Sequence, residues 1–289
     1  FPTRNFPAYL PMIMSTVAGN VLGQDGIRLV DIDFPESVLK ELPGPMMGID
    51  GIRKLLNVYN RPLVGAILKP CIGVTPDVSA AGALKAAMGG AEVIKDDVLQ
   101  SYPEYSPMEK RARAVMDLLR ANGKDKACLY AVNITGENLF DRARRAIDAG
   151  ANSLMVNYQS MGWGAVEDFI RAMKRENLIY PIFGHCAGMG AYYRSAANGI
   201  ATALSCGKLA RIGGMDASGL SRQRPLRHSH QRAGGDPRPV HRAYEEHQEL
   251  LYDRGRRRAR GRHRVSDEPA GERLHAHGRR RHLWPPHGR

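Results

Sequence analysis

Between Arg61 and Asp216 the sequence alternates short apolar runs with longer amphipathic stretches, and this alternation restricts the fold more than any other feature. The apolar runs have the length of β-strands, and the stretches between them have the length of helices. Strands that alternate with helices in this way pair in parallel. The expected strands cover residues 63–68, 91–94, 128–132, 153–157, 179–183 and 214–217, and the expected helices cover residues 79–88, 106–121, 139–149, 166–175 and 200–211.

Two α/β folds share this alternation, the (β/α)8 TIM barrel and the open doubly wound sheet. In a barrel the carboxyl ends of all strands meet at one mouth, whereas an open sheet brings only two or three of them together. No Gly-x-Gly-x-x-Gly follows the first strand, which also disfavours a dinucleotide-binding sheet. We therefore predict a TIM barrel that is truncated after the sixth strand. The polar residues at or just past strand ends that favour it are Lys69, residues 95–97, Asn133, Asn157 and His185.

The net charge of +13 is distributed unevenly. Residues 221–289 hold 18 Arg, no Lys, 8 acidic residues and 9 of the 10 His, whereas residues 1–220 hold 24 basic and 21 acidic side chains. A basic surplus favours nucleic acid or an anionic membrane as partner, but here it belongs almost entirely to the tail. We expect residues 1–60 to be a linker or remnant of an N-terminal domain, residues 61–218 the barrel, and residues 219–289 a poorly ordered tail. Because Phe1 is not an initiator Met, we expect the sequence to begin inside a longer chain.

The four cysteines form no Cys-x-x-Cys pair, so a zinc site is not expected. No signal peptide is visible, and the most apolar early stretch, residues 7–17, is too short to span a bilayer. We therefore expect reduced thiols, a cytoplasmic location and no membrane partner. The segment Asn133-Ile134-Thr135 has a glycosylation pattern, which has no use in a cytoplasmic chain.

Residues at three strand ends could carry chemistry. Lys69 ends an apolar strand, where partial desolvation would lower its pKa and suit it to proton abstraction, although a lysine that extends into solvent fits the spacing equally well. Lys95 and Asp97 should face one side of their strand, where Asp97 could bind a hard cation or form a plain ion pair. His185 could be a proton shuttle, a phosphate contact or a structural hydrogen-bonding residue.

Two lysine motifs resemble the large subunit of ribulose-bisphosphate carboxylase/oxygenase (RuBisCO) and its RuBisCO-like relatives: residues 61–70 (RPLVGAILKP) and residues 89–97 (GGAEVIKDD). Residues 15–23 (STVAGNVLG) resemble the segment that joins the N-terminal domain of this family to its barrel. Residues 35–60, which contain LPGP, resemble the next linker. The similarity spans about residues 13–217.

The resemblance implies a role for five residues. Lys69 matches the catalytic lysine that moves the proton during enolisation, and His185 matches a histidine in the active-site mouth. Lys95 matches a lysine that carbon dioxide carbamylates, and with Asp97 it would hold Mg²⁺, because a carbamate gives a lysine oxygen donors. Asn20 matches an asparagine that reaches metal and substrate oxygens from the linker. The family builds its active site at a dimer interface, so a homodimer of the parent protein is implied.

Departures from the family pattern change the expected activity. Val98 stands where carboxylases have a third metal-binding carboxylate, Cys71 where they have a second lysine, and Cys186 where they have a phosphate-binding arginine. Losing an oxygen donor should weaken Mg²⁺ binding, because water must then fill the octahedral shell. We therefore expect a RuBisCO-like enzyme that uses Mg²⁺ to enolise a phosphorylated sugar or keto substrate, as an isomerase, enolase or decarboxylase. A ribulose-bisphosphate carboxylase and an inactive truncated product are the alternatives.

Two hypotheses explain the tail. A displaced reading frame between Asp216 and Leu220 would account at once for the end of the alternation, the loss of Lys and the rise of Arg and His. One choice of codons for residues 277–288, shifted by one base, encodes Gly-Gly-Gly followed by Gly-His-Pro, which resembles the last phosphate loop of the family. A native disordered segment that binds nucleic acid is the alternative, although it has few aromatic residues for base stacking. We favour the displaced frame, which the underlying DNA would reveal, and do not expect a nucleic-acid partner.

Overall fold

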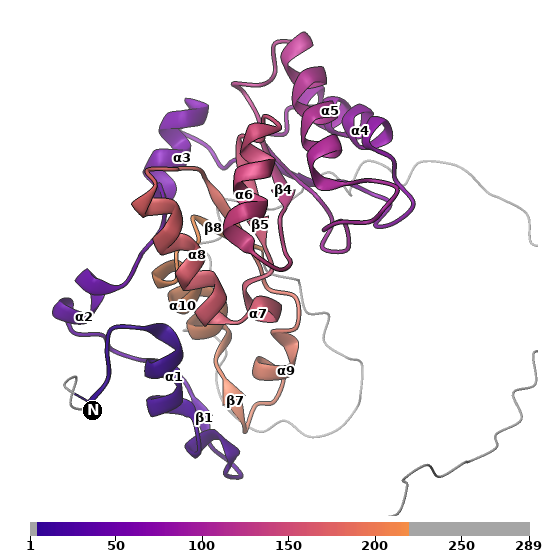
Figure 1. Ribbon diagram of the computed structural model, residues 1–289. Helices are drawn as coiled ribbons and strands as arrows, with labels where there is room; N and C mark the ends of the chain where they lie inside the picture. Colours follow the sequence, from indigo (N-terminus) through magenta and orange to yellow (C-terminus); the bar gives the residue numbers. More distant parts are fainter. Residues whose placement is uncertain (1–4, 220–289) are drawn as a thin grey trace, which may run out of the picture. The chain divides into compact units, whose positions relative to one another are not determined.

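The computed structural model describes residues 5–219, and within them six strands form one parallel sheet (Figure 1). Their spatial order is β2-β3-β4-β5-β6-β8, which keeps their order along the chain. In a doubly wound sheet the strand order reverses at a switch point. The order of these strands does not reverse, so the topology is that of a partial (β/α) barrel, as predicted. The strands are β2 (Gly65–Ile67), β3 (Val93–Lys95), β4 (Leu129–Asn133), β5 (Ser153–Val156), β6 (Ile182–His185) and β8 (Ala217–Gly219).

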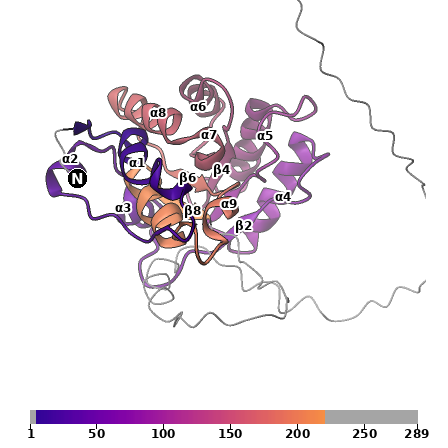
Figure 2. The same cartoon turned by 90° about the horizontal axis from the view of Figure 1, so that it is seen from below.

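Helices cover the outer face of this sheet. Figure 2 shows α8, α6, α5 and α4 in an arc around the strands, and successive helices of the arc contact each other. Between helices and strands lies an apolar core in which Ile94, Tyr130 and Leu154 are fully buried. The helices of the arc are α4 (Pro76–Met88), α5 (Met108–Ala121), α6 (Leu139–Asp148) and α8 (Trp163–Arg175).

The inner face of the sheet has its own apolar cluster. Because side chains alternate along a strand, Val93, Met155 and Phe183 point away from the outer core and pack together inside. Helix α3 (Gly48–Leu56) adds Ile52 to this cluster, beside residues that lie near the start of the strands. The amino-terminal end of the interior is therefore filled by apolar side chains, and the carboxyl ends of the strands are left for polar residues.

Asp216 links three elements at the amino-terminal end. One carboxylate oxygen, Oδ1, accepts hydrogen bonds from the backbone N–H groups of Met47 and Gly48, both at 2.7 Å. The other oxygen, Oδ2, accepts from the N–H of Ile182 at 2.8 Å. Burial raises the pKa of Asp216, although these hydrogen bonds act in the opposite direction. A single buried carboxylate thus joins the start of α3 to β6 and β8.

The described part of the expected linker, residues 5–60, packs onto the barrel helices. Helix α1 (Leu10–Ala18) lies against α8, where the buried carboxylate of Glu167 accepts a hydrogen bond from the N–H of Leu10 at 2.8 Å. Strand β1 (Arg28–Leu29) pairs in parallel with β7 (Gly199–Ile200) in a separate two-stranded sheet. The short helices of this region are η2 (Val21–Gly23) and α2 (Glu36–Glu41).

The expected helix over residues 200–211 is wrong at its start. Ile200 belongs to β7, and the helix begins with the π-helical segment η3 (Ala203–Lys208), followed by α10 (Leu209–Ile212). Ile200 pairs with Leu29, which lies 171 positions earlier, and local pattern alone cannot distinguish such a strand residue from an apolar residue of a helix. Two further short helices were not expected, α7 (Tyr158–Met161) and α9 (Gly190–Tyr193).

The interpretations of residues 220–289, as a displaced frame or a nucleic-acid-binding tail, lie outside the described residues. In the part of the chain that the structure describes, no helix combines the length and the apolar character that crossing a membrane requires.

Candidate functional site

The register of the first two strands places Lys69 opposite Asp97. Ile67 of β2 is paired with Lys95 of β3, so the residues two positions later also lie side by side. The Nζ atom of Lys69 forms an ion pair with Oδ2 of Asp97, whose side chain is only 5% exposed against 55% for the lysine. Hydrogen bonds from Lys69 and from the N–H of Leu99 (3.1 Å) outweigh the effect of burial and hold the pKa of Asp97 below its usual value.

The prediction that desolvation lowers the pKa of Lys69 is wrong. The hydrogen bond to Asp97 and a second one to the Sγ atom of Cys71, at 2.8 Å, raise this pKa, and partial burial opposes them only weakly. Lys69 is half-exposed and has a carboxylate partner, so its charged form is stabilised.

Of the two lysines at these strand ends, Lys95 is the one whose charged form burial destabilises. It is 5% exposed, and its Nζ donates to the backbone oxygen of Asp96 at 2.7 Å. The same Nζ lies 3.5 Å from Sδ of Met155 and 5.8 Å from the ring centre of Phe183. Burial lowers the pKa of Lys95 to about 8, with the nearby aspartates acting in the opposite direction. Near pH 8 a large fraction of Lys95 is therefore the neutral amine, which is the form that reacts with carbon dioxide.

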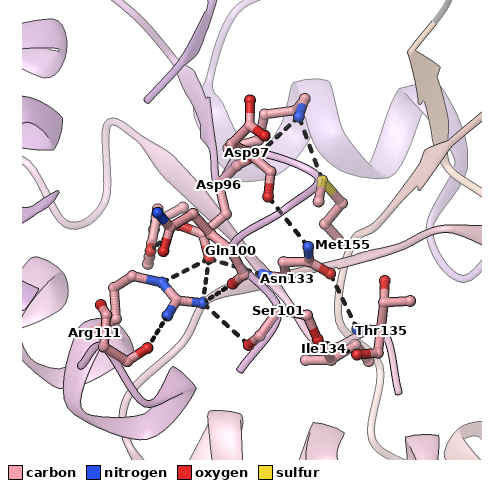
Figure 3. Close-up of polar contacts among 12 residues, drawn as sticks. Asp96, Asp97, Gln100, Ser101, Arg111, Asn133, Ile134, Thr135 and Met155 are labelled. Atoms are coloured by element: carbon pink, nitrogen blue, oxygen red, sulfur yellow. Dashed lines mark hydrogen bonds and ion pairs between the residues drawn. The ribbon is translucent and has the colours of Figure 1, made fainter. Parts of the chain in front are cut away.

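Asp96 faces the opposite side, as strand alternation predicts, and binds the fully buried Arg111 of α5 (Figure 3). Its Oδ2 accepts from Nε and Nη2 of Arg111, at 3.0 and 2.9 Å, and from the N–H of Asn133 at 2.9 Å. Its Oδ1 accepts from the hydroxyl of Tyr130. Arg111 also donates to the backbone oxygens of Ser106 (2.5 Å) and Gln100. This network fixes the segment after β3, which carries Asp97.

Residues 133–135 have a glycosylation pattern but are part of the fold here, since Asn133 is fully buried. Its Nδ2 donates to the backbone oxygens of Asp97 and Val98, at 3.2 and 3.0 Å. Its Oδ1 accepts from the N–H of Thr135 at 3.0 Å (Figure 3). Asn133 therefore holds the end of β4 against the segment after β3.

Asn157 was noted in the sequence only as a strand-end residue. Its N–H donates to Oγ1 of Thr135 at 3.0 Å, and the residue is 5% exposed. The Oδ1 of Asn157 is buried without a hydrogen-bond partner, as is Oε1 of Gln100. The sequence signal for Asn157 is its position just after a strand, two residues beyond Met155 of the inner cluster.

His185 ends β6 and is close enough to Lys95 and Asp97 for their charges to affect its pKa. Burial, followed by the charge of Lys95, lowers that pKa to about 4. The Nδ1 atom accepts a hydrogen bond from the N–H of Ala187 at 3.1 Å, so the ring proton is assigned to Nε2. At neutral pH His185 is therefore neutral, with Nδ1 accepting this hydrogen bond and Nε2 able to donate one.

Asn20 is not brought to this group. It is exposed and precedes η2, in a segment whose neighbours include α1. Within residues 5–219 no hydrogen bond links it to Lys69, Lys95 or Asp97.

The family model for the ribulose bisphosphate carboxylase large chain, catalytic domain, matches residues 48–221. The chain belongs to this family. The region that matches the RuBisCO family model contains Lys69, Lys95, Asp97 and His185. It does not include Asn20.

Named relatives place the chain among RuBisCO-like proteins. The ribulose bisphosphate carboxylase-like protein of Archaeoglobus fulgidus is 38% identical over 221 residues, which cover 75% of this chain and 50% of the relative. The 2,3-diketo-5-methylthiopentyl-1-phosphate enolase of Geobacillus kaustophilus is 37% identical over 223 residues, which cover 75% and 52%. The crystal structure of a rubisco-like protein (MtnW) from Alicyclobacillus acidocaldarius matches with a TM-score of 0.68 and 34% identity, over 75% of this chain and 55% of that one. The chain spans about half the length of the curated relatives it matches.

The oxygen donors of this RuBisCO-like chain fit Mg²⁺ only if Lys95 is modified. Among the described residues no three His, Cys, Asp or Glu side chains gather as a metal-binding group. Asp97 offers a carboxylate, Asp96 is engaged by Arg111, and Val98 has no side-chain oxygen. A carbamate on Lys95 would add the negatively charged oxygens that a hard cation requires.

Proposed function

We propose that this chain is the barrel part of a RuBisCO-like enzyme that removes a proton next to the carbonyl of a phosphorylated sugar or keto substrate. The observation that carries the proposal is the convergence of Lys69, Lys95 and Asp97 at the carboxyl ends of β2 and β3, near His185. The enolase name of the Geobacillus relative supports a phosphorylated diketone as substrate. Val98, which lacks the third carboxylate, favours an enolase over a carboxylase.

In the proposed mechanism Lys95 first becomes a carbamate. Its neutral Nζ forms a bond to the carbon of carbon dioxide and releases one proton to solvent. Mg²⁺ held by this carbamate and Asp97 would supply positive charge that stabilises the enolate oxygen. Lys69, whose pKa the hydrogen bonds to Asp97 and Cys71 raise, would accept the substrate proton in its neutral form. His185 donates from Nε2 to a substrate oxygen.

We further propose that the active form is a homodimer. Asn20, which the resemblance places in the active site, lies in the chain on an exposed turn apart from Lys69 and Asp97. A second copy could bring its own Asn20 to the mouth of the barrel, in agreement with the interface site that the family resemblance implies.

The proposed reaction predicts hydrogen exchange at the carbon next to the carbonyl. The full chain is incubated in D₂O with Mg²⁺, bicarbonate and 2,3-diketo-5-methylthiopentyl-1-phosphate, and exchange is followed by proton NMR. We expect exchange above the uncatalysed rate, and we expect a chelator to remove the excess. The absence of exchange with this substrate and with ribulose bisphosphate would contradict the proposal. Incorporation of labelled carbon dioxide into ribulose bisphosphate would support the carboxylase instead.

The pH dependence of carbamylation tests the role of Lys95. At constant dissolved carbon dioxide we expect the rate to rise with pH and to be half-maximal near pH 8, because only the neutral amine reacts and burial lowers this pKa to about 8. Carbon-13 NMR with labelled bicarbonate measures the adduct. Lys95→Met is the control, since methionine suits the contacts with Met155 and Phe183. An adduct that persists in Lys95→Met, or a midpoint near the ordinary lysine value of 10.5, would show that another lysine reacts.

A further inference from the structure

We propose that Asn157 supplies the oxygen donor that Val98 lacks, with its side-chain amide oxygen as a third protein ligand of the divalent cation. This inference rests on the proposed function, because it requires a cation held by carbamylated Lys95 and Asp97. It assigns to this chain a donor set of one carbamate, one carboxylate and one neutral amide.

The first support is the face of the sheet on which Asn157 lies. Met155 belongs to the inner apolar cluster, and its Sδ is 3.5 Å from Nζ of Lys95. Asn157 is the first residue after β5, and the alternation along that strand, continued by one residue, places it on the inner side, one step nearer the carboxyl end. A carbamate extends the Lys95 side chain beyond Nζ, and Asn157 follows Met155 on that face.

The second support is a series of hydrogen bonds that joins Asn157 to Asp97. The N–H of Asn157 donates to Oγ1 of Thr135, at 3.0 Å. The N–H of Thr135 donates to Oδ1 of Asn133, also at 3.0 Å, and Nδ2 of Asn133 donates to the backbone oxygen of Asp97 at 3.2 Å. The ends of β3, β4 and β5 are thereby held together, and Asn157 and Asp97 lie at the same edge of the sheet.

The third support is the unpartnered oxygen itself. The Oδ1 of Asn157 is buried without a hydrogen-bond partner, in a residue that is 5% exposed. A buried polar oxygen without a donor is unfavourable, and a bound cation or an ordered water can compensate it. Asparagine amide oxygens coordinate hard divalent cations alongside carboxylates. Gln100 also has an unpartnered oxygen, but its Nε2 is bound to the backbone oxygen of Cys71 at 2.9 Å, in the segment after β2.

The test compares Mg²⁺ binding by variants of the full chain in bicarbonate buffer. Titration calorimetry and the Mg²⁺-dependent rise in unfolding temperature are the readouts, so catalytic activity is not required. We expect Asn157→Ala to raise the dissociation constant for Mg²⁺ at least about tenfold, since even outer-shell partners of metal ligands contribute about 10–100-fold. Asn157→Asp should retain binding, because a carboxylate oxygen replaces the amide oxygen. Gln100→Met, which removes the other unpartnered amide oxygen, should bind Mg²⁺ like the unmodified chain.

A carboxylate restored at position 98 provides the sharpest comparison. We expect Val98→Glu to strengthen Mg²⁺ binding, and the double variant Val98→Glu/Asn157→Ala to bind more tightly than Asn157→Ala alone. If Mg²⁺ with bicarbonate does not raise the unfolding temperature of the chain without substitutions, both the proposed function and the role of Asn157 are wrong. If Mg²⁺ raises the unfolding temperature of the chain without substitutions and of Asn157→Ala equally, only the role of Asn157 is overturned. An equal loss in Gln100→Met would also overturn it, because the effect would then not be specific to Asn157.

Discussion

Replacing Arg111 with methionine is expected to lower the free energy of unfolding by about 3–5 kcal/mol, the range observed when one partner of a buried ion pair is removed. The substitution leaves the carboxylate of Asp96, which is 1% exposed, without its cation. It also removes the donors to the backbone oxygens of Ser106 and Gln100. Urea denaturation followed by circular dichroism measures the change.

Arg113→Met is the matched control, because Arg113 lies two residues further along α5 and is exposed. We expect this control to change the free energy of unfolding by no more than about 0.5 kcal/mol, as is usual for surface positions. Arg111→Lys should fall between the two variants, since it keeps the charge but loses the paired geometry of the guanidinium. Equal effects of Arg111→Met and Arg113→Met would show that the buried pair does not hold the segment after β3.

Replacing Lys69 with alanine is expected to lower the rate of substrate hydrogen exchange by about 10²–10⁴-fold, the usual contribution of a positioned general base. Because Lys69 is half-exposed at the mouth, a small primary amine added to Lys69→Ala should restore part of the exchange. The exchange assay in D₂O measures both effects.

The control is Lys208→Met, since Lys208 is also partly exposed and paired with an aspartate, Asp31, but belongs to η3. Lys208→Met should catalyse hydrogen exchange of the substrate at the same rate as the chain without substitutions. If Lys69→Ala catalyses hydrogen exchange of the substrate as fast as Lys208→Met does, Lys69 is not the base.

The parts of the fold that depend on local pattern could be predicted from the sequence. The alternation of strand-length and helix-length stretches was enough to predict a parallel sheet. Because Lys69 and Asp97 each follow one of two neighbouring strands, they could be expected at the same edge of it. The alternation along β3 also separated Asp96 from its neighbours on either side, and the ion pair with Arg111 agrees with that separation.

The properties that depend on distant residues could not be predicted in the same way. Burial by Met155 and Phe183, from other strands, makes Lys95 rather than Lys69 the lysine with the lowered pKa. Asn157 could be noted in the sequence only as a strand-end residue, and the missing hydrogen-bond partner of its buried oxygen depends on the surrounding fold. The position of Asn20 on an exposed turn, apart from Lys69, also depends on how the linker folds, which the similarity of its segment does not describe.

The carboxylate of Asp216 has a consequence for the order in which the chain folds. It binds the backbone of Met47 and Gly48, which are separated from it by 169 and 168 positions in the sequence. Contacts of such long range slow folding, because a large loop must close before they form. During synthesis on the ribosome, α3 therefore emerges long before the residue that fixes its first turn. Until Asp216 is made, its carboxylate cannot fix α3 over the inner apolar cluster, and transiently exposed apolar surface of this kind favours aggregation.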